Sequence, residues 1–261
     1  MHSALWISKT GLSAMDKQLS VVSNNLANIS TVGFKKDRAV FEDLLYHTVR
    51  QPGGLSTQNN ELPSGLQIGA GVRVTATQKD FSEGDYNITD RQLDVAIQGD
   101  GFFQVLQPDG TIGYTRDGSF QLNSNGQIVT PNGLLLEPAV TIDPDVVEIT
   151  IGDDGVVSVL RAGQTDTEEV GAINVAGFIN PAGLAALGQN LFAETNASGA
   201  PIVGVPGEDS LGELRQGMLE ASNVNSVEEL VNMITTQRAY EMNSKVISTA
   251  DSMLGFVTQQ L

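Results

Sequence analysis

The side chains that most often perform acid–base or nucleophilic chemistry are sparse in this sequence. It has two histidines, His2 and His47, and no cysteine. Neither histidine has a Ser-centred turn or a paired acid at a suggestive spacing, and without cysteine there is no disulfide, thiolate metal site or thiol nucleophile. We therefore predict no catalytic residues and no enzyme activity. A His-Asp-Ser site assembled only in three dimensions stays open on sequence alone.

Six Asp-Gly or Asn-Gly pairs raise the question of calcium binding. They lie at positions 100–101, 109–110, 117–118, 125–126, 132–133 and 154–155. An EF-hand loop needs acidic or amide residues at positions 1, 3 and 5 and Glu at position 12. Loops centred on Gly126 and Gly155 fail this pattern. Tight turns explain the pairs more simply, because both residues tolerate positive φ. No phosphate loop ending in Gly-Lys-Ser/Thr occurs either, so we expect no metal, no cofactor and no small-molecule substrate.

The net charge of −17 is concentrated in the middle of the chain. Residues 73–220 hold six basic and 22 acidic side chains, whereas residues 1–50 carry +2 and residues 221–261 carry −2. An acidic middle disfavours nucleic acid, while nearly neutral ends can pack against copies of themselves with little repulsion. An acidic surface that only aids solubility is equally compatible. The 31 acids single out no glycosidase-like pair.

Both ends of the chain carry apolar residues at helical spacing. The N-terminal stripe predicts a helix over residues 3–30 with a heptad seam, Leu5, Leu12, Met15, Leu19, Val22, Leu26 and Ile29, followed by a stop at Gly33. The C-terminal stripe repeats every seven residues, at Met233, Tyr240, Ile247, Leu254 and Leu261, and is widened by Val246, Ala250, Met253 and Val257. Ser226 and Glu229 predict a capping box at its start.

What these helices contact is open at this point. In one interpretation they fold onto the middle of the chain as ordinary amphipathic elements. In the other, which we favour because both ends carry a stripe, they reach out to partners. The stripes then have no partner in a single chain, so we expect both ends to be disordered until assembly.

Between the ends the apolar period changes to two. Leu93, Val95 and Ile97 alternate with other residues, as do Val147, Ile149 and Ile151, and this alternation predicts strands. The segment between Ile151 and Val156 predicts a hairpin. We expect an antiparallel β domain over 73–220, either barrel or sandwich. Residues 51–71 are polar and rich in Gly and Pro, which is typical of a flexible linker or a long exposed loop.

Four segments resemble the rod and hook proteins of the bacterial flagellar axis. They are NNLANISTVGFK (24–35), GDGFFQV (99–105), YTRDGSFQLNSNGQIVTPNG (114–133) and SNVNSVEELVNMITTQRAYEMNSK (222–245), in the order of that family. QPGGLSTQ and LPSGLQIGAGV, within residues 51–72, resemble the stretch that marks distal rod members of the family. The length also suits these members, because hook subunits usually carry an additional outer domain.

The resemblance implies an α+β subunit whose long terminal helices form a coiled-coil-like end domain, with a mainly antiparallel β domain outside. We expect an N-terminal axial helix at 1–33, an extended connecting segment at 34–72, the β domain at 73–220 and a C-terminal axial helix at 221–261. The implied function is a structural subunit that polymerises into the distal rod, the periplasm-spanning drive shaft of the basal body. Implied partners are copies of itself, proximal rod and hook subunits, the surrounding ring proteins and the type III export apparatus. The N-terminus lacks the features of a secretory signal and no 18-residue apolar stretch occurs, so we expect export without a cleaved signal and no membrane span.

The resemblance and the stripes together define two candidate sites. The polymerisation interface comprises Leu5, Leu12, Met15, Leu19, Val22, Asn24, Asn25, Leu26, Asn28, Ile29, Gly33, Phe34, Leu230, Met233, Ile234, Gln237, Arg238, Tyr240, Asn243, Ile247 and Leu254. The rod-specific segment comprises Gln51, Pro52, Gly53, Leu62, Pro63, Ser64, Gly65, Leu66, Gly69 and Gly71. The alternatives are a sister subunit of the proximal rod or hook, a secreted β-rich enzyme acting on the cell wall, and a self-contained coiled-coil binding module.

Overall fold

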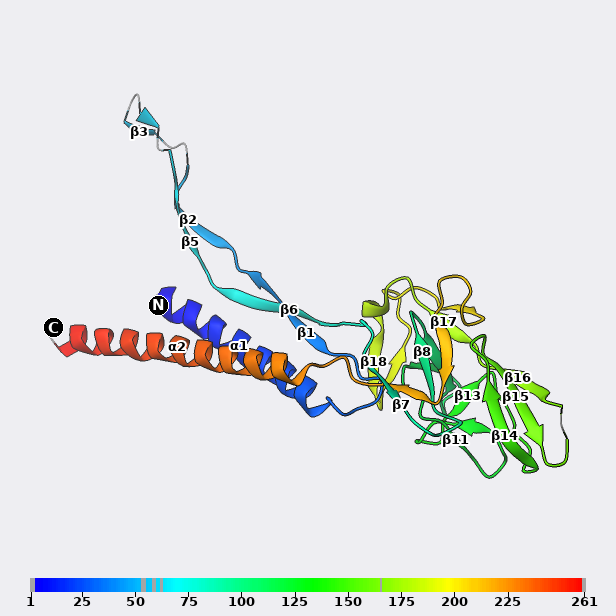
Figure 1. Ribbon diagram of the computed structural model, residues 1–261. Helices are drawn as coiled ribbons and strands as arrows, with labels where there is room; N and C mark the ends of the chain where they lie inside the picture. Colours follow the sequence, from blue (N-terminus) through cyan, green and yellow to red (C-terminus); the bar gives the residue numbers. More distant parts are fainter. Residues whose placement is uncertain (1–2, 53–54, 58–59, 62, 165, 260–261) are drawn as a thin grey trace. The chain divides into compact units, whose positions relative to one another are not determined.

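The computed structural model describes residues 3–52, 55–57, 60–61, 63–164 and 166–259 (Figure 1). The fold is α+β. The chain divides into two compact units that are interleaved in sequence. Unit 1 comprises Met1–Ala27, Asp37–Gln78 and Asn225–Leu261, and unit 2 comprises Asn28–Lys36 and Lys79–Val224. The four consecutive segments that we expected from the sequence remain predictions.

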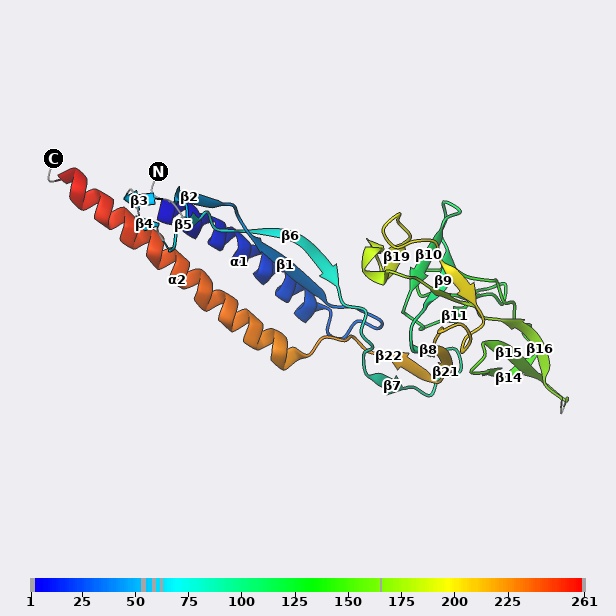
Figure 2. The same cartoon turned by 90° about the horizontal axis from the view of Figure 1, so that it is seen from above.

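Unit 1 contains the two long helices, α1 (Ser3–Ala27) and α2 (Ser226–Gln259). They run side by side in opposite directions (Figures 1 and 2). Gly33 has a φ of 66°, as predicted for the stop after the first helix. The predicted capping box is wrong by one residue, because Asn225 Oδ1 accepts hydrogen bonds from the amides of Val227 and Glu228, at 3.0 and 3.3 Å. Asn225 is therefore the N-cap of α2.

The two helices form within a single chain, whereas we expected disordered ends. Their stripes face each other, so each helix buries apolar surface against the other. Leu12 and Leu19 of α1 are half-buried, as are Met233 and Ile247 of α2. Helices in proteins owe most of their stability to such packing, and this contact explains the difference.

The connecting segment is a ribbon of paired strands rather than a flexible linker. Its ladder pairs β1 (Asp37–Asp43) with β6 (Val72–Lys79), β2 (Tyr46–Arg50) with β5 (Leu66–Gly69), and β3 (Leu55–Thr57) with β4 (Asn60–Glu61) (Figure 1). Among the described residues that suggested a loop, Pro52, Pro63, Gly65 and Gly71 lie between paired strands, where they do not interrupt the pairing.

Unit 2 is built from short strands. They are β7 (Tyr86–Ile88), β8 (Val95–Gln98), β9 (Phe102–Leu106), β10 (Ile112–Thr115), β11 (Gln121–Leu122), β12 (Ile128–Val129), β13 (Leu135–Glu137), β14 (Val146–Ile151), β15 (Val156–Arg161), β16 (Glu168–Ala172), β17 (Val175–Gly177), β18 (Ala185–Gly188), β19 (Leu191–Ala193), β20 (Ile202–Gly204), β21 (Glu213–Gln216) and β22 (Met218–Glu220). A 3₁₀ turn, η1 (Pro181–Gly183), precedes β18.

The strands of unit 2 pair in antiparallel fashion, as predicted. The largest sheet has nine strands in the order β11-β12-β13-β9-β10-β19-β18, and β17 joins it by pairing with both β9 and β20. Strands β14, β15 and β16 form a second sheet, while β8 pairs with β21 and β7 with β22. The predicted hairpin between Ile151 and Val156 is confirmed, because β14 pairs with β15 across that turn.

The core of unit 2 departs from the predicted alternation in two places. Asp94 and Ala96, which alternate in sequence with the apolar core residues, are themselves only 1% exposed. Val95 and Ile97 are fully buried, and Ile149 and Ile151 face the same core. Val147 is 67% exposed, against prediction. The register of β14 shifts between Val146 and Glu148, and a bulge of this kind turns the preceding side chains to the other face.

Candidate assembly surfaces

The predicted heptad stripes mostly form the contact between α1 and α2. The helices touch along much of their length, and between them lies a hollow of about 340 Å³ lined by residues that include Met15, Leu19, Thr236 and Tyr240. A Cβ at Gly11 would lie 3.2 Å from Asn243 Nδ2, so a glycine there lets the helices approach closely. Several predicted interface residues therefore already have a partner inside the chain.

A second apolar stripe runs along α2 on the side away from α1. It comprises Val227, Leu230, Val231, Ile234, Met242, Val246, Met253 and Phe256, which are between 47% and 68% exposed. At about 100° per residue, these positions cluster on one side of the helix. The side chains that contact α1, such as Thr236 and Ile247, cluster on the opposite side.

The sequence reasoning found only part of this outer stripe. Leu230 and Ile234 were predicted as interface residues, and Val246 and Met253 were noted as widening the heptad stripe. A single heptad seam does not include the other four members, Val227, Val231, Met242 and Phe256. Their spacing of three, four, seven and eight residues is the signal that could have found them. The helix has two apolar faces, which a single seam cannot describe.

Further apolar side chains are exposed elsewhere in unit 1. They are Trp6 and Ile7 on α1 and Phe41, Leu45, Tyr46, Val49, Leu66 and Ile68 on the ribbon, with Leu45 91% exposed. At β2 and β5 the described part of the ribbon is two strands wide. An isolated two-stranded ribbon is marginally stable in water. Contact with a neighbouring molecule would therefore bury this apolar surface and stabilise the ribbon.

The described residues of the rod-specific segment lie in β5 and in the unpaired stretches next to the ribbon strands. Gln51, Pro52, Pro63 and Ser64 are exposed, while Leu66 and Gly69 belong to β5 and Gly53 and Leu62 lie outside the described residues. The structure explains why positions 65 and 71 are glycine. A Cβ at Gly65 would lie 2.6 Å from the Arg50 carbonyl oxygen, and one at Gly71, whose φ is 113°, would overlap Thr10 Oγ1.

Some predicted interface residues are held inside their own unit. Asn25 is 2% exposed and makes a two-point bridge, donating through Nδ2 to the Asp37 carbonyl and accepting from its amide, both at 2.9 Å. Val22 is buried. Gly33 is buried against the backbone of Arg116, where a Cβ would lie 2.7 Å from the carbonyl carbon. These three residues stabilise the fold, and we do not assign them to a surface offered to a neighbour.

The other predicted residues divide by exposure. Leu5, Leu12, Met15, Leu19, Leu26, Asn28, Ile29, Phe34, Met233, Asn243, Ile247 and Leu254 are half-buried, whereas Asn24, Leu230, Ile234, Gln237, Arg238 and Tyr240 are exposed. Of the exposed members on α2, Leu230 and Ile234 belong to its outer stripe, whereas Gln237 and Tyr240 line the hollow beside α1.

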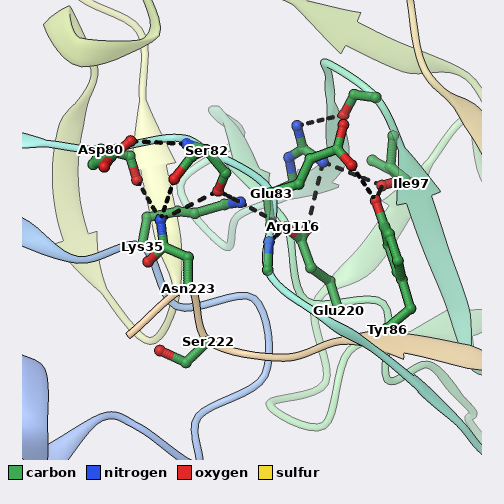
Figure 3. A network of polar contacts seen from close by, with 12 residues as sticks. Lys35, Asp80, Ser82, Glu83, Tyr86, Ile97, Arg116, Glu220, Ser222 and Asn223 are labelled. Atoms are coloured by element: carbon green, nitrogen blue, oxygen red, sulfur yellow. Dashed lines mark hydrogen bonds and ion pairs between the residues drawn. The ribbon is translucent and has the colours of Figure 1, made fainter. Parts of the chain in front are cut away.

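Unit 2 contains a buried polar cluster that spacing did not reveal (Figure 3). Lys35 Nζ lies 2.6 Å from Glu220 Oε1 and donates to the Ser82 carbonyl at 2.7 Å. Arg116 Nη1 lies 3.4 Å from Glu220 Oε2, and the Gly84 amide donates to Glu220 Oε1 at 3.0 Å. Burial lowers the pKa of Lys35, and the attraction of Glu220 opposes this shift. Burial and the neighbouring Glu83 raise the pKa of Tyr86, which keeps its hydroxyl neutral.

Two charged members of this cluster, Lys35 and Arg116, come from the segments that carried the family resemblance. Lys35 ends the N-terminal segment and Arg116 lies in the YTRDG segment, while Glu220 just precedes the C-terminal one. They are separated by 81 to 185 positions, with Lys35 and Glu220 at the extremes. Only the presence of Lys35 and Arg116 in the matching segments could have pointed to these two residues.

The part of the chain that the structure describes contains neither a metal-binding group nor a membrane-spanning helix. No group of three or more His, Asp or Glu side chains is arranged to hold a metal ion. None of the described helices is both long and apolar enough to cross a membrane.

Three family models match the chain. A model described as "Flagella basal body rod protein" matches residues 5–35, "Flagellar hook protein FlgE/F/G D1 domain" matches 96–159, and "Flagellar basal body rod FlgEFG protein C-terminal" matches 215–260. The first and third cover most of α1 and α2. The second covers the part of unit 2 that contains Arg116.

Full-length relatives distinguish between members of this group. The flagellar basal-body rod protein FlgG of Buchnera aphidicola subsp. Schizaphis graminum is 55% identical over 259 residues, which is 99% of this chain and 100% of the relative. In Caulobacter vibrioides, the protein FlgG is 47% identical, covering 98% of each chain, whereas the protein FlgF is 33% identical, covering 100% of this chain and 98% of the relative. Within one organism, the FlgG protein is thus more similar to this chain than the FlgF protein. The chain belongs to the FlgG family of flagellar basal-body rod proteins.

Proposed function

We propose that this chain is the subunit of the distal rod, and that it polymerises into the tubular drive shaft that transmits torque from the motor to the hook. The observation that carries the proposal is the outer stripe of α2. A single chain leaves this stripe in water, and an apolar surface of that length marks an interaction site. A helix that packs among several neighbours buries both of its apolar faces.

Burial of this stripe by a neighbour favours assembly. A large apolar side chain contributes about 1.5–3 kcal/mol when it is fully buried. The eight side chains of the stripe are roughly half exposed, so each gains roughly 1 kcal/mol when a neighbour covers it. The nearly neutral charge of the two chain ends adds little repulsion between copies.

The ribbon supplies the second contact in this proposal. Its exposed side chains, Leu45 and Val49 among them, pack against a neighbouring subunit, and the rod-specific segment at its tip stiffens the shaft. This assignment draws on the exposure of these residues and on the marginal stability of an isolated two-stranded ribbon.

The family supports several broader statements. The chain is a structural protein of the flagellar basal body that self-assembles with other flagellar components, and it is not an enzyme. The finer parts belong to the proposal. They are coiled-coil pairing of the helices in the rod wall, contacts with proximal rod and hook subunits, passage through the ring proteins, and delivery by the type III export apparatus without a cleaved signal. The greater identity to the FlgG protein than to the FlgF protein of one organism disfavours a sister subunit.

The test uses cells that lack the gene and express either Met242→Asp or Ser244→Asp. Met242 is 62% exposed on the outer stripe, and Ser244 is exposed on the flank of the same helix. We expect electron micrographs of basal bodies to show short rods without hooks for Met242→Asp and complete rods for Ser244→Asp. Immunoblots of exported protein must show equal export. Complete rods from Met242→Asp cells would refute the assignment of this stripe to assembly.

A further inference from the structure

Residues Asn28–Lys36 have an unusual connection to unit 2. They belong to unit 2, yet the chain on both sides, α1 before them and β1 after them, belongs to unit 1. No covalent bond therefore joins this nine-residue segment to the rest of unit 2. Only non-covalent contacts hold it there, so the segment is a docked loop rather than part of the continuous β chain.

Backbone hydrogen bonds line the docked segment on two sides. The Gly33 amide donates to the Glu220 carbonyl at 2.8 Å, and the Asp80 amide donates to the Lys36 carbonyl at 2.9 Å. The side chain of Asn223 joins these sides, because its Oδ1 accepts from the Lys36 amide and its Nδ2 donates to the Asp80 carbonyl, both at 2.8 Å (Figure 3).

The Lys35 side chain enters the interior of unit 2 from this segment. It is 1% exposed, and its ammonium group donates to Glu220 and to the Ser82 carbonyl. The backbone of Gly33 presses directly on Arg116, with no room for a side chain. A buried ammonium group that donates to these partners fixes the position of the segment on unit 2.

The site that receives Lys35 is balanced in charge without it. Glu220 keeps Arg116 at 3.4 Å and the Gly84 amide at 3.0 Å. Arg116 also donates through Nη2 to the Gly99 carbonyl at 2.8 Å. Removing Lys35 thus leaves a paired carboxylate, and the β core does not acquire an isolated charge.

We propose that Asn28–Lys36 is a docking plug with Lys35 as its pin, and that it can leave unit 2 while the β core stays folded. Docking adds a third link to unit 2, besides the covalent passages at residues 78–79 and 224–225. In the proposed rod subunit, this attachment shares the load between three chain segments. The plug itself is independent of that function and can be tested on the purified chain.

The test is hydrogen exchange measured by mass spectrometry on the full chain, comparing Lys35→Met with Lys36→Met. The second variant is a matched control, because the Lys36 side chain makes only a 3.7 Å ion pair with Asp80 at the surface. For Lys35→Met we expect exchange at least about tenfold faster in peptides that contain Gly33 and Asp80, with a clearly smaller acceleration in peptides from β9 and β15. For Lys36→Met we expect no change beyond Asp80.

A further disrupting variant, Asn223→Ala, is to be compared with Lys35→Met. It removes the bridge between the two sides and leaves the ion pair with Glu220 intact. It should accelerate exchange in the same peptides. Unchanged exchange around Gly33 in both variants would overturn the proposal. Equal acceleration of exchange throughout unit 2 in Lys35→Met would also overturn it, since Lys35 would then be part of the core and not of a separable plug.

Discussion

Removing Glu220 should destabilise unit 2 much more than removing Lys35, although the two side chains form one ion pair. Glu220→Gln keeps the shape of the side chain and removes only the anion. It leaves the Lys35 ammonium and the Arg116 guanidinium buried without a carboxylate between them. Breaking a buried pair by removing one partner costs about 3–5 kcal/mol. Lys35→Met instead leaves Glu220 paired with Arg116, and loses hydrogen bonds to a charged group worth about 1.5–3 kcal/mol, partly offset by the buried methionine.

The expected difference is large enough to measure by differential scanning calorimetry of the full chain. For a unit the size of unit 2, each kcal/mol lowers Tm by about 2–4 °C. Glu220→Gln should therefore lower the Tm of unit 2 by about 6–20 °C, and Lys35→Met by less than half as much. An equal or larger loss in Lys35→Met would refute the charge-balance argument, because Lys35 would then be the group on which the cluster depends.

The pH dependence of the Glu220→Gln variant tests the same reasoning. The pKa of Lys35 is lowered from 10.5 by burial, and Glu220 is the largest effect that opposes the shift. Between the lowered pKa and 10.5 the unfolded chain binds more protons than the folded chain, so stability rises with pH. Without Glu220 this window is wider. The Tm deficit of the variant should shrink as pH rises from 7 towards 9, below the range where Tyr86 titrates in either state. A constant deficit would contradict this explanation.

Two further predictions concern unit 1. Asn225→Ala should lower the stability of α2 by about 1 kcal/mol, measured by thermal circular dichroism at 222 nm, whereas Ser226→Ala should have a smaller effect; the reverse order would restore the predicted capping box. Gly71→Ala should cost at least about 1–3 kcal/mol of unit 1 stability, because φ is 113° and a Cβ would overlap Thr10. Gly163→Ala, where φ is 87° and the space is open, is the control for strain alone, and it should show the smaller loss.

Local patterns in the sequence were enough to predict the α+β class, both terminal helices and the hairpin at residues 151–156. Periodicity is a property of neighbouring residues, and these elements are defined by their neighbours. The wrong predictions arise where the same local pattern is compatible with two different structures. Gly65 and Gly71 looked like linker residues, yet each is small because another backbone or side chain approaches it. Val147 matched an alternating pattern that a bulge interrupts one residue away.

The candidate site was harder to predict than the fold, because its residues are selected by contacts between distant segments. A heptad seam identifies one apolar face of α2, and that face is already covered by α1 in a single chain. The outer stripe of Val231, Met242 and Phe256 becomes visible only when the covered face is known. The Lys35 cluster depends on a pairing with Glu220 across 185 positions, and no spacing rule encodes such a pair.

The segments that carry the family resemblance contain two kinds of residue. Some stabilise the fold of their own unit and others are exposed for assembly, although the sequence alone suggested a single interface. In residues 24–35, Asn25 and Lys35 are buried and bind Asp37 and Glu220 in their own units. In residues 222–245, Asn223 likewise binds within unit 2, whereas Ile234 and Met242 are exposed. A buried hydrogen-bonded residue is costly to replace because its partners lose their bonds, whereas an exposed apolar residue gains its value only from a neighbour. Substitutions of the first kind should therefore reduce the stability of the isolated chain, and those of the second kind should affect assembly alone.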